Sequence, residues 1–467
     1  MANATTTAAS KQQHISLRKV LGPIHIWALG VGIVLVGEFT GWNFSMAKGG
    51  AWGALIACWF VGLLYTCVAM IDSEVTSTVA AAGGQYTQAK HIIGPLMAFN
   101  VGLYLVMAYT MLEASNAIVV GDLLKQLAGD MGSPDISTRP FIVLTIVLLA
   151  WLNYRGVYAT LNINFVITAI AFISIIILFF SVAPFSPGKV LLHKDLLTDL
   201  PYGWIGALGA LQFGMWYYLG IEGTCQAAEE VRSAGRSIPL GTMSGMITLL
   251  IAAALTWYIA AGLMPWQYLG QAYTPLYDAA KLAGGGGLQA IMFIGTLFAA
   301  LASANGCIND ASRAWFSMGR DRYMPEWFGA VHPRYRTPYR AILFLVPIAV
   351  VFALVFVTAL DLVIGFSILS GLLSYTFMSI NMIRFRKLWP LGSISRGYVH
   401  PFHPVTAIVL LILCIAVYFA TYLGYTKMLL SIMVFYIIAS LWFAYHRYQY
   451  VKRGDQFTMA WPRPKGY

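Results

Sequence analysis

The chain has 467 residues, of which 59% are hydrophobic and only 10% are charged. Soluble domains carry roughly 25% charged residues, so this composition excludes an ordinary water-soluble enzyme and indicates a membrane protein with several spans. A formal net charge of +11 would suit nucleic-acid binding in a soluble protein, but here the basic residues lie between apolar runs. We therefore expect the lipid bilayer as a partner and no nucleic acid.

Apolar runs of about 20 residues are long enough to cross a bilayer. In chain order they predict an all-α polytopic membrane protein with 12 transmembrane helices, at 24–48, 51–71, 95–123, 140–154, 159–184, 204–228, 240–264, 286–317, 339–359, 361–383, 404–423 and 426–446. The loops between these runs are too short to bury a soluble core.

The distribution of Lys and Arg predicts the orientation of these spans. Loops and ends on the side of the N-terminus hold 22 of the 29 basic residues, and the opposite side holds 7. Because cytoplasmic loops are enriched in Lys and Arg, we expect both termini in the cytoplasm and the chain in the plasma membrane, which is the inner membrane in a bacterium.

Two predicted spans are interrupted near their middle by glycines that flank a carboxylate. The first contains Gly37-Glu38-Phe39-Thr40-Gly41 and the sixth contains Gly220-Ile221-Glu222-Gly223. Glycine tolerates non-helical dihedral angles, and matched interruptions in two halves point to a transport site between inverted repeats. Close packing of membrane helices through glycine is the alternative.

The interruptions divide the chain into two repeats of five helices with opposite orientations. The predicted parts are a cytoplasmic tail at 1–22, a first repeat at 23–184, a second repeat at 204–383, helices 11 and 12 at 404–446, and a basic cytoplasmic tail at 447–467.

Five groups of residues follow one another in a characteristic order. They are Glu74 with Gly83-Gly84-Gln85-Tyr86 and Gly94-Pro95; Asn153-Tyr154-Arg155-Gly156-Val157; Trp216 through Glu222; Glu230-Val231 with Ile238-Pro239; and Ser312-Arg313 through Pro325 with Thr337-Pro338. This order resembles the amino acid, polyamine and organocation (APC) superfamily of permeases. The resemblance implies the five-plus-five inverted repeat with broken helices 1 and 6.

Within that superfamily, the segment from Gly37 to Asn43, followed by Gly49-Gly50, is most similar to ethanolamine permeases. Amino-acid permeases have a Gly-Ser-Gly type of break, whose free amides hold the substrate carboxylate. The sequence Val36-Gly37-Glu38 departs from that pattern.

Four acidic residues, Glu38, Glu113, Glu222 and Asp310, fall inside predicted spans without a deep Lys or Arg to neutralise them. Intramembrane ionisable residues are costly and mark functional sites. The countercharge would come from a substrate, a coupling cation or protons. Glu38 would repel a substrate carboxylate and so favours an organic amine; a protonated, structural Glu is the alternative.

The other acidic residues suggest further roles. Glu113 lies one helical turn after Tyr109 on the same face, where it could meet a substrate ammonium or bond a neighbouring helix. Glu222 is expected in substrate contact, proton sensing or gating. Asp310 precedes Arg313 by three residues, which predicts an ion pair or gate element.

Trp216 resembles the aromatic residue that covers the substrate in arginine and agmatine exchangers, and its ring face would attract a cation; core packing is the alternative. The predicted substrate-binding residues are therefore Gly37, Glu38, Phe39, Gly41, Tyr109, Glu113, Trp216, Gly220, Ile221 and Glu222. The predicted gating or coupling residues are Trp216, Glu222 and Asp310.

No metal or cofactor is expected, because the five cysteines lie in apolar runs without metal-ligand spacing. The coupling ion is either H⁺ or Na⁺. Ser303 and Asn305 are candidate Na⁺ ligands together with carbonyls of helix 1. Some proton-coupled relatives carry a lysine on helix 5, and the span at 159–184 has none.

The sequence thus predicts a permease that imports a small organic amine, with ethanolamine as the leading substrate. An amino-acid permease and a diamine or polyamine permease or exchanger are alternatives, and a non-transporting amine sensor is an alternative of another class. An enzyme is not expected, since the spans offer no nucleophile with a base and no metal set.

Overall fold

The computed structural model describes Leu17 and residues 19–133, 135–182 and 200–451. Most of the predicted tail at 1–22, much of the tail at 447–467 and most of the loop between the two repeats lie outside these residues. The described part of the chain consists of helices and connecting loops and contains no β-strand, apart from one isolated bridge between Leu21 and Val231.

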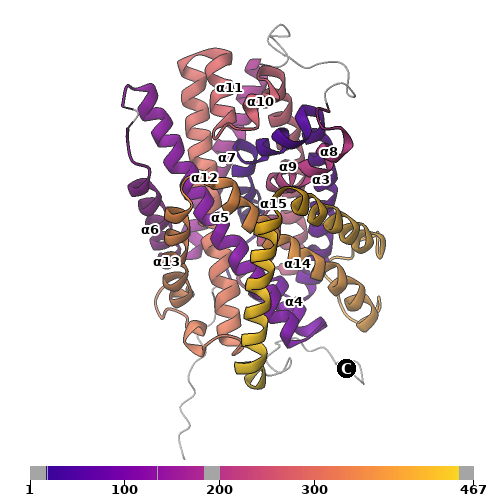
Figure 1. The fold of residues 1–467 in the computed structure, drawn as a ribbon. Helices are drawn as coiled ribbons and strands as arrows, with labels where there is room; N and C mark the ends of the chain where they lie inside the picture. The colour runs from indigo at the N-terminus through magenta and orange to yellow at the C-terminus, as the bar shows by residue number, and fades with distance from the viewer. Residues whose placement is uncertain (1–16, 18, 134, 183–199, 452–467) are drawn as a thin grey trace, which may run out of the picture.

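The long helices run in several directions through a thick bundle (Figure 1). They are α3 (Met46–Thr78), α5 (Pro95–Asp130), α6 (Arg139–Arg155), α7 (Val157–Val182), α9 (Ala234–Leu263), α12 (Gly286–Arg320), α13 (Tyr339–Val355), α14 (Leu360–Leu388) and α15 (Val405–His446). The shorter ones are α1 (Pro23–Val34), α2 (Val36–Phe39), α4 (Gln85–Ile92), α8 (Gly203–Gly214), α10 (Trp266–Leu269) and α11 (Pro275–Gly284).

Seven of the described helices are long and apolar enough to cross a membrane. They lie within 42–78, 95–130, 160–182, 234–263, 286–320, 360–388 and 405–446, and two shorter apolar helices lie at 23–39 and 339–355. Two long helices contain a residue with non-helical dihedral angles where the sequence separates two spans: Gly50 in α3 and Tyr425 in α15. The count of 12 spans and the inverted repeat stay predictions.

Helix α3 continues to Thr78, beyond the apolar run that ends at residue 71. The added turns carry Asp72 and Glu74, which are fully buried. Partners from other elements satisfy them: Gln85 donates to Asp72 over 2.9 Å, and Arg386 donates two hydrogen bonds to Glu74. Hydropathy alone therefore ends this helix too early, because paired polar groups can be buried.

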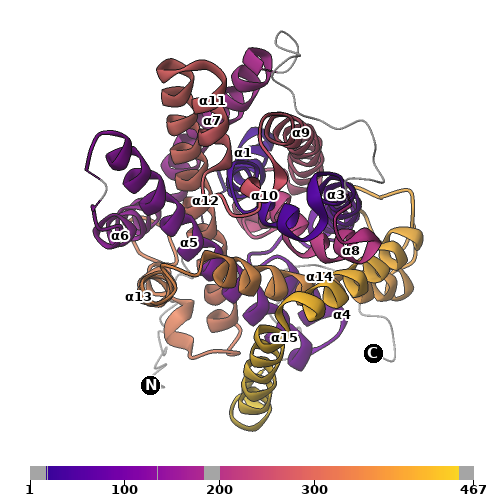
Figure 2. The same ribbon diagram turned by 45° about the horizontal axis from the view of Figure 1, so that its top comes forward.

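Helix α1 lies near the centre of the bundle (Figure 2) and packs against α9, α7 and α12. The segment after it is held by α10 and the loop that follows α10. Asn43 donates hydrogen bonds to the carbonyls of Leu269 (2.6 Å) and Ala272 (2.8 Å), and Thr40 donates to the carbonyl of Tyr273 (2.6 Å). The first interruption is thus tied to a segment more than 200 residues away in the chain.

Candidate functional site

The first interruption begins where α2 ends. Thr40 has extended dihedral angles (φ −158°, ψ 160°), and Gly41 follows with φ +92° before the 3₁₀ turn Trp42–Ser45. Side chains strongly disfavour this φ, so glycine is the suitable residue here. The sequence located this break within residues 37–41, and the structure narrows it: Gly37 and Glu38 are still helical in α2.

The second interruption is longer than the sequence suggested. Helix α8 ends at Gly214, six residues before Gly220, and 3₁₀ turns at Met215–Tyr217 and Ile221–Cys225 follow. Gly220 itself has φ +112°. The glycines placed this break at 220–223, and the family resemblance placed it at 216–222. In the structure it begins at Met215, so it includes Trp216, which contacts the first interruption.

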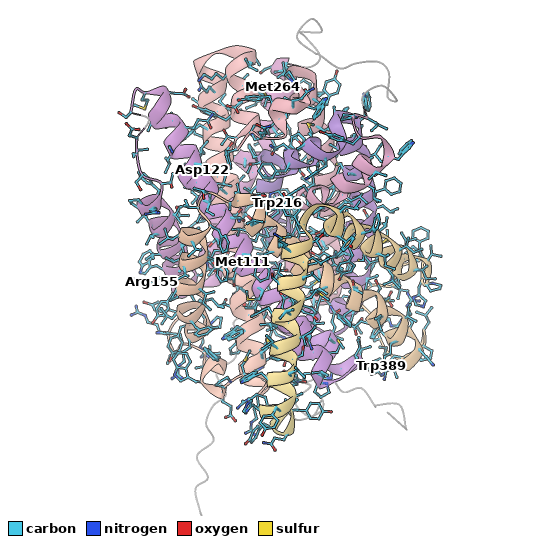
Figure 3. All side chains as sticks on the ribbon, viewed as in Figure 1. Met111, Asp122, Arg155, Trp216, Met264 and Trp389 are labelled. Atoms are coloured by element: carbon cyan, nitrogen blue, oxygen red, sulfur yellow. The ribbon has the colours of Figure 1, made fainter. Side chains whose placement is uncertain are left out.

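Trp216 joins the two interruptions. A Cβ atom added to Gly37 would collide with the carbonyl of Trp216, and one added to Gly41 would collide with its indole ring. The indole is 2% exposed, and its Nε1 has no hydrogen-bond partner within the described residues. Figure 3 places Trp216 inside the bundle, between the end marked by Met264 and the end marked by Trp389.

Two backbone amides at the interruptions donate hydrogen bonds to side chains of the same segments. The amide of Gly41 donates a 2.9 Å hydrogen bond to Oδ1 of Asn43. The amide of Gly220 donates a 3.2 Å hydrogen bond to Oε2 of Glu222. Free amides at such breaks attract anions, and here these two are already bonded to an amide oxygen and a carboxylate.

The Glu38 carboxylate is completely buried. Its Oε2 accepts a 3.2 Å hydrogen bond from Thr256 of α9, and its Oε1 has no hydrogen-bond partner among the residues that the structure describes. None of the ion pairs in the described part of the chain includes Glu38. A buried carboxylate with a free oxygen is costly, so this position can accept a hydrogen-bonding cation or a proton.

The Glu222 carboxylate is also buried and belongs to the second interruption itself. Tyr109 of α5 and Tyr375 of α14 direct their hydroxyl groups toward it, although neither contact meets the geometry of a standard hydrogen bond. Glu222 therefore combines a bond to the Gly220 amide with two nearby phenols from separate helices.

A comparison with known families identifies the chain. The family model described as "Amino acid permease" matches residues 21–389. The chain belongs to the amino acid permease family. It is 68% identical to an uncharacterized transporter of Rhizobium meliloti over 99% of both chains. It is 25% identical to the methylthioribose transporter of Bacillus subtilis, over 88% of this chain and 90% of that one. It is 23% identical to a branched-chain amino acid permease of the same bacterium, over 86% and 87%.

The family and these relatives are transporters, which agrees with the expectation of a transporter and not an enzyme. With seven apolar helices of spanning length, the chain is an integral membrane transporter. The motifs identified from the sequence at 74–95, 153–157, 216–239 and 312–338 lie within the matched region.

In this transporter Asp310 forms no ion pair with Arg313, so the ion-pair alternative is wrong, and the gating role of Asp310 stays a prediction. The Arg313 side chain turns away and bonds Glu230, with Nε and Oε1 2.6 Å apart. Asp310 accepts a 2.9 Å hydrogen bond from Asn309 through Oδ1. Within the described part of the chain its Oδ2 has no hydrogen-bond partner, and it lies where a Cβ of Gly223 would be. The spacing places Asp310 and Arg313 on one face of α12. The long Arg313 side chain nevertheless reaches a carboxylate on another element, Glu230.

Tyr109 and Glu113 are both buried on α5 and share a neighbour on α12. Tyr109 lies near Glu222, and both Tyr109 and Glu113 lie near Cys307 of α12. Oε1 of Glu113 has no hydrogen-bond partner among the described residues.

Ser303 and Asn305, the candidate Na⁺ ligands, face different helices. Ser303 donates a hydrogen bond to the carbonyl of Ile33 in α1. Asn305 bonds Asn153 of α6 (2.8 Å) and Asn164 of α7 (3.1 Å). In this conformation the pair does not converge on one point, and Ser303 is the member that contacts α1.

Two other predicted residues pack against glycines. Phe39 lies against Gly295 of α12, and Ile221 lies against Gly30 of α1 and Gly245 of α9. Both side chains are completely buried. These contacts set how closely the interrupted segments approach their neighbours.

Sequence reasoning missed several polar residues near the site. Thr256 and Tyr375 lie inside apolar spans, where a single hydroxyl gives little signal. Glu230 was noted within a motif, but not as a partner for Arg313. Asp72 fell just outside its predicted span, although a polar residue beside Glu74 on a continuing helix was an available clue.

Proposed function

We propose that this transporter is a secondary-active permease that imports a small organic amine by alternating access, with ethanolamine as the leading substrate. The proposal includes 12 spans, inverted repeats at 23–184 and 204–383, and cytoplasmic termini in the plasma membrane. Uptake would move the amine through the region where the two interruptions meet.

The hydrogen bonds that two backbone amides make at the interruptions are the main support for this proposal. A substrate with a carboxylate needs free amides or a basic side chain to receive it. The Gly41 amide is bonded to Asn43, and the Gly220 amide is bonded to Glu222. Glu222 thus acts as an internal carboxylate at a position where a substrate anion would bind, and this favours a substrate without a carboxylate.

Features that favour a cation lie on the same interruptions. Glu38 offers a buried oxygen that no described residue hydrogen-bonds, one residue after the glycine that contacts Trp216. Trp42 and Tyr217 stack with ring centroids 5.2 Å apart. Aromatic faces attract ammonium groups more strongly where water is excluded, so Trp216 would cover an amine held by Glu38.

The test is uptake of labelled ethanolamine into proteoliposomes by the wild type, Glu38→Gln and a control variant, Glu326→Gln. Glu326 begins the 3₁₀ turn Glu326–Gly329 and forms a surface ion pair with Arg322; its side chain is 64% accessible, so the control loses a charge elsewhere. We expect saturable uptake by the wild type and the control, and loss of uptake by Glu38→Gln with folded protein retained. Full uptake by Glu38→Gln would contradict the proposal.

An amino-acid substrate is the second candidate, because the family is described as amino acid permeases. Unlabelled competitors separate the two: amines without a carboxylate should block uptake, and amino acids should not. Diamines would be favoured if several of the four intramembrane carboxylates bind cations. Binding without flux would indicate a sensor.

The coupling ion is tested in the same vesicles. An imposed inward proton gradient and an imposed inward Na⁺ gradient are compared at equal membrane potential. Stimulation by Na⁺ and its loss in Ser303→Ala would support a Na⁺ site at the contact between Ser303 and α1. Stimulation by the proton gradient alone would direct attention to the four carboxylates.

A further inference from the structure

An apolar groove of about 470 Å³ lies between α5, α13, α14 and the second half of α15, and no residue of either interruption lines it. Its walls include Met107 and Met111 of α5, Phe366 of α14, and Met428 and Phe435 of α15. Figure 3 shows Met111 beside the yellow part of α15. Phe435 is exposed at the surface of the protein, so the groove opens on the outside of the helix bundle.

The walls of the groove suit a flexible apolar chain. Phe366 makes edge-to-face contacts with Phe352 and Phe435, at 6.3 and 6.5 Å between ring centroids. Met428 lies against Gly365, where an added Cβ would meet its Cε at 2.8 Å. Methionine side chains adapt to irregular partners, and a volume of this size is typical of a ligand pocket.

One end of the groove carries a positive charge. Lys427 lines it, is exposed, and makes no ion pair with any residue that the structure describes. Ser431 lies one turn further along on the same helix and also lines the groove. The groove therefore combines an apolar body with a cationic end.

The position of Lys427 along α15 is that of a membrane boundary. A straight helix of 42 residues would be about 63 Å long, roughly twice the hydrocarbon thickness of a bilayer. Tyr425 interrupts it with φ −141° and ψ 47°, so the two halves each have the length of one span. Lys427 lies in the first turn of the second half, where a lysine reaches headgroup phosphates.

We propose that this groove binds one acyl chain of an anionic phospholipid, with the lipid phosphate at Lys427. In a membrane, lipid is the medium that meets an open apolar groove, and the lone lysine selects a headgroup with net negative charge. The bound chain would contact α5 at Met107 and Met111, on either side of Tyr109. It would also contact Phe366, whose neighbour Ser367 donates a 2.7 Å hydrogen bond to the carbonyl of Ala108 in α5.

Such a lipid would support the packing of α14 on α5, and α5 carries Tyr109 and Glu113. The inference does not depend on which substrate is transported, so it survives if the amine proposal fails.

The first test uses the wild-type protein and a phosphatidylglycerol whose acyl chain carries a photoreactive diazirine. After illumination in vesicles, labelled peptides are mapped by mass spectrometry. We expect labelling concentrated in 428–435 and 107–111, and competition by unlabelled phosphatidylglycerol but not by phosphatidylcholine. Labelling spread evenly over the exposed apolar faces, or equal competition by both lipids, would overturn the proposal.

Native mass spectrometry of detergent-purified variants gives the second test. Ser431→Trp should fill the groove and lose the retained phosphatidylglycerol, whereas Ile438→Trp, on an exposed face of the same helix, should keep it. Lys427→Ala should lose the preference for phosphatidylglycerol over phosphatidylcholine, and Lys387→Ala, at an exposed position on α14, should keep that preference. Retention by Ser431→Trp equal to wild type, or a second copy of the chain crosslinked over the groove, would overturn the proposal.

Discussion

Nε of Arg313 donates a 2.6 Å hydrogen bond to Oε1 of Glu230, and both side chains are at most 3% exposed. Arg313 also donates to the carbonyl of Asn309, one turn earlier in α12. The guanidinium thus joins α12 to the loop that follows the second interruption, and Asp310 has no ion-pair partner in the described structure.

Removing the Glu230 charge should destabilise the protein far more than removing the Asp310 charge. Glu230→Gln leaves a buried guanidinium without its carboxylate, a change that costs about 3–5 kcal/mol in buried pairs. Asp310→Asn keeps the shape of its side chain and leaves the Arg313 pair intact. Melting temperatures of the two detergent-purified variants check this. An equal loss in both variants would mean that Arg313 serves both carboxylates.

Gly41→Ala should abolish most transport because it disturbs Trp216. An alanine at position 41 would have to adopt φ +92°, and its methyl group would collide with the indole. Small displacements of a binding group can reduce rates by roughly 10–100-fold. Gly132→Ala is a matched control, since Gly132 has φ +90° with no atom within 4 Å of the added Cβ. Uptake of labelled ethanolamine should fall strongly only in Gly41→Ala. A similar fall in both variants would assign the effect to backbone strain and not to Trp216.

Glu222→Ala should change which substrates the transporter recognises. The variant frees the Gly220 amide, which then can bind a carboxylate. We expect slower ethanolamine uptake together with stronger competition by small neutral amino acids than in the wild type. Competition assays at fixed ethanolamine concentration measure this. If amino acids compete no better with the variant, the Gly220 amide is not the feature that excludes carboxylates.

His403 should make stability depend on pH. Burial and the neighbouring Arg386 and His400 lower the pKa of His403 from its usual value near 6.5. Below about pH 6.5 the unfolded state therefore binds more protons at this histidine than the folded state does. The contribution of neutral His403 to stability is complete above about pH 6.5 and decreases as the pH falls below that value. Nearby Glu74 opposes part of this shift.

The measurement is the melting temperature between pH 7.5 and pH 5.5. The wild type should lose stability toward the acidic end, and His403→Asn should lose less. His332→Asn is the control, because His332 is in a different loop, between η6 (Glu326–Gly329) and α13. The same pH dependence in wild type and His403→Asn would show that another group causes it.

The sequence by itself determined the helical, membrane-spanning character of this protein, because apolar runs of sufficient length have few other stable structures. Local chemistry also located most helix bounds to within a few residues and identified Gly41 and Gly220 as break positions. Both adopt positive φ, a property of the glycine residue itself. The order of the motifs identified the permease superfamily, because each motif is a short stretch of consecutive residues that can be read from the sequence alone.

The tertiary structure decided which groups meet. The contact of Trp216 with Gly37 and Gly41 joins segments about 175 residues apart, and Thr256 reaches Glu38 across 218 residues. The partner of Arg313 could not be read from its spacing to Asp310. Periodicity tells which face of a helix is buried, but the rotation and depth of neighbouring helices decide which side chains on those faces bond. These quantities come from packing over the whole bundle.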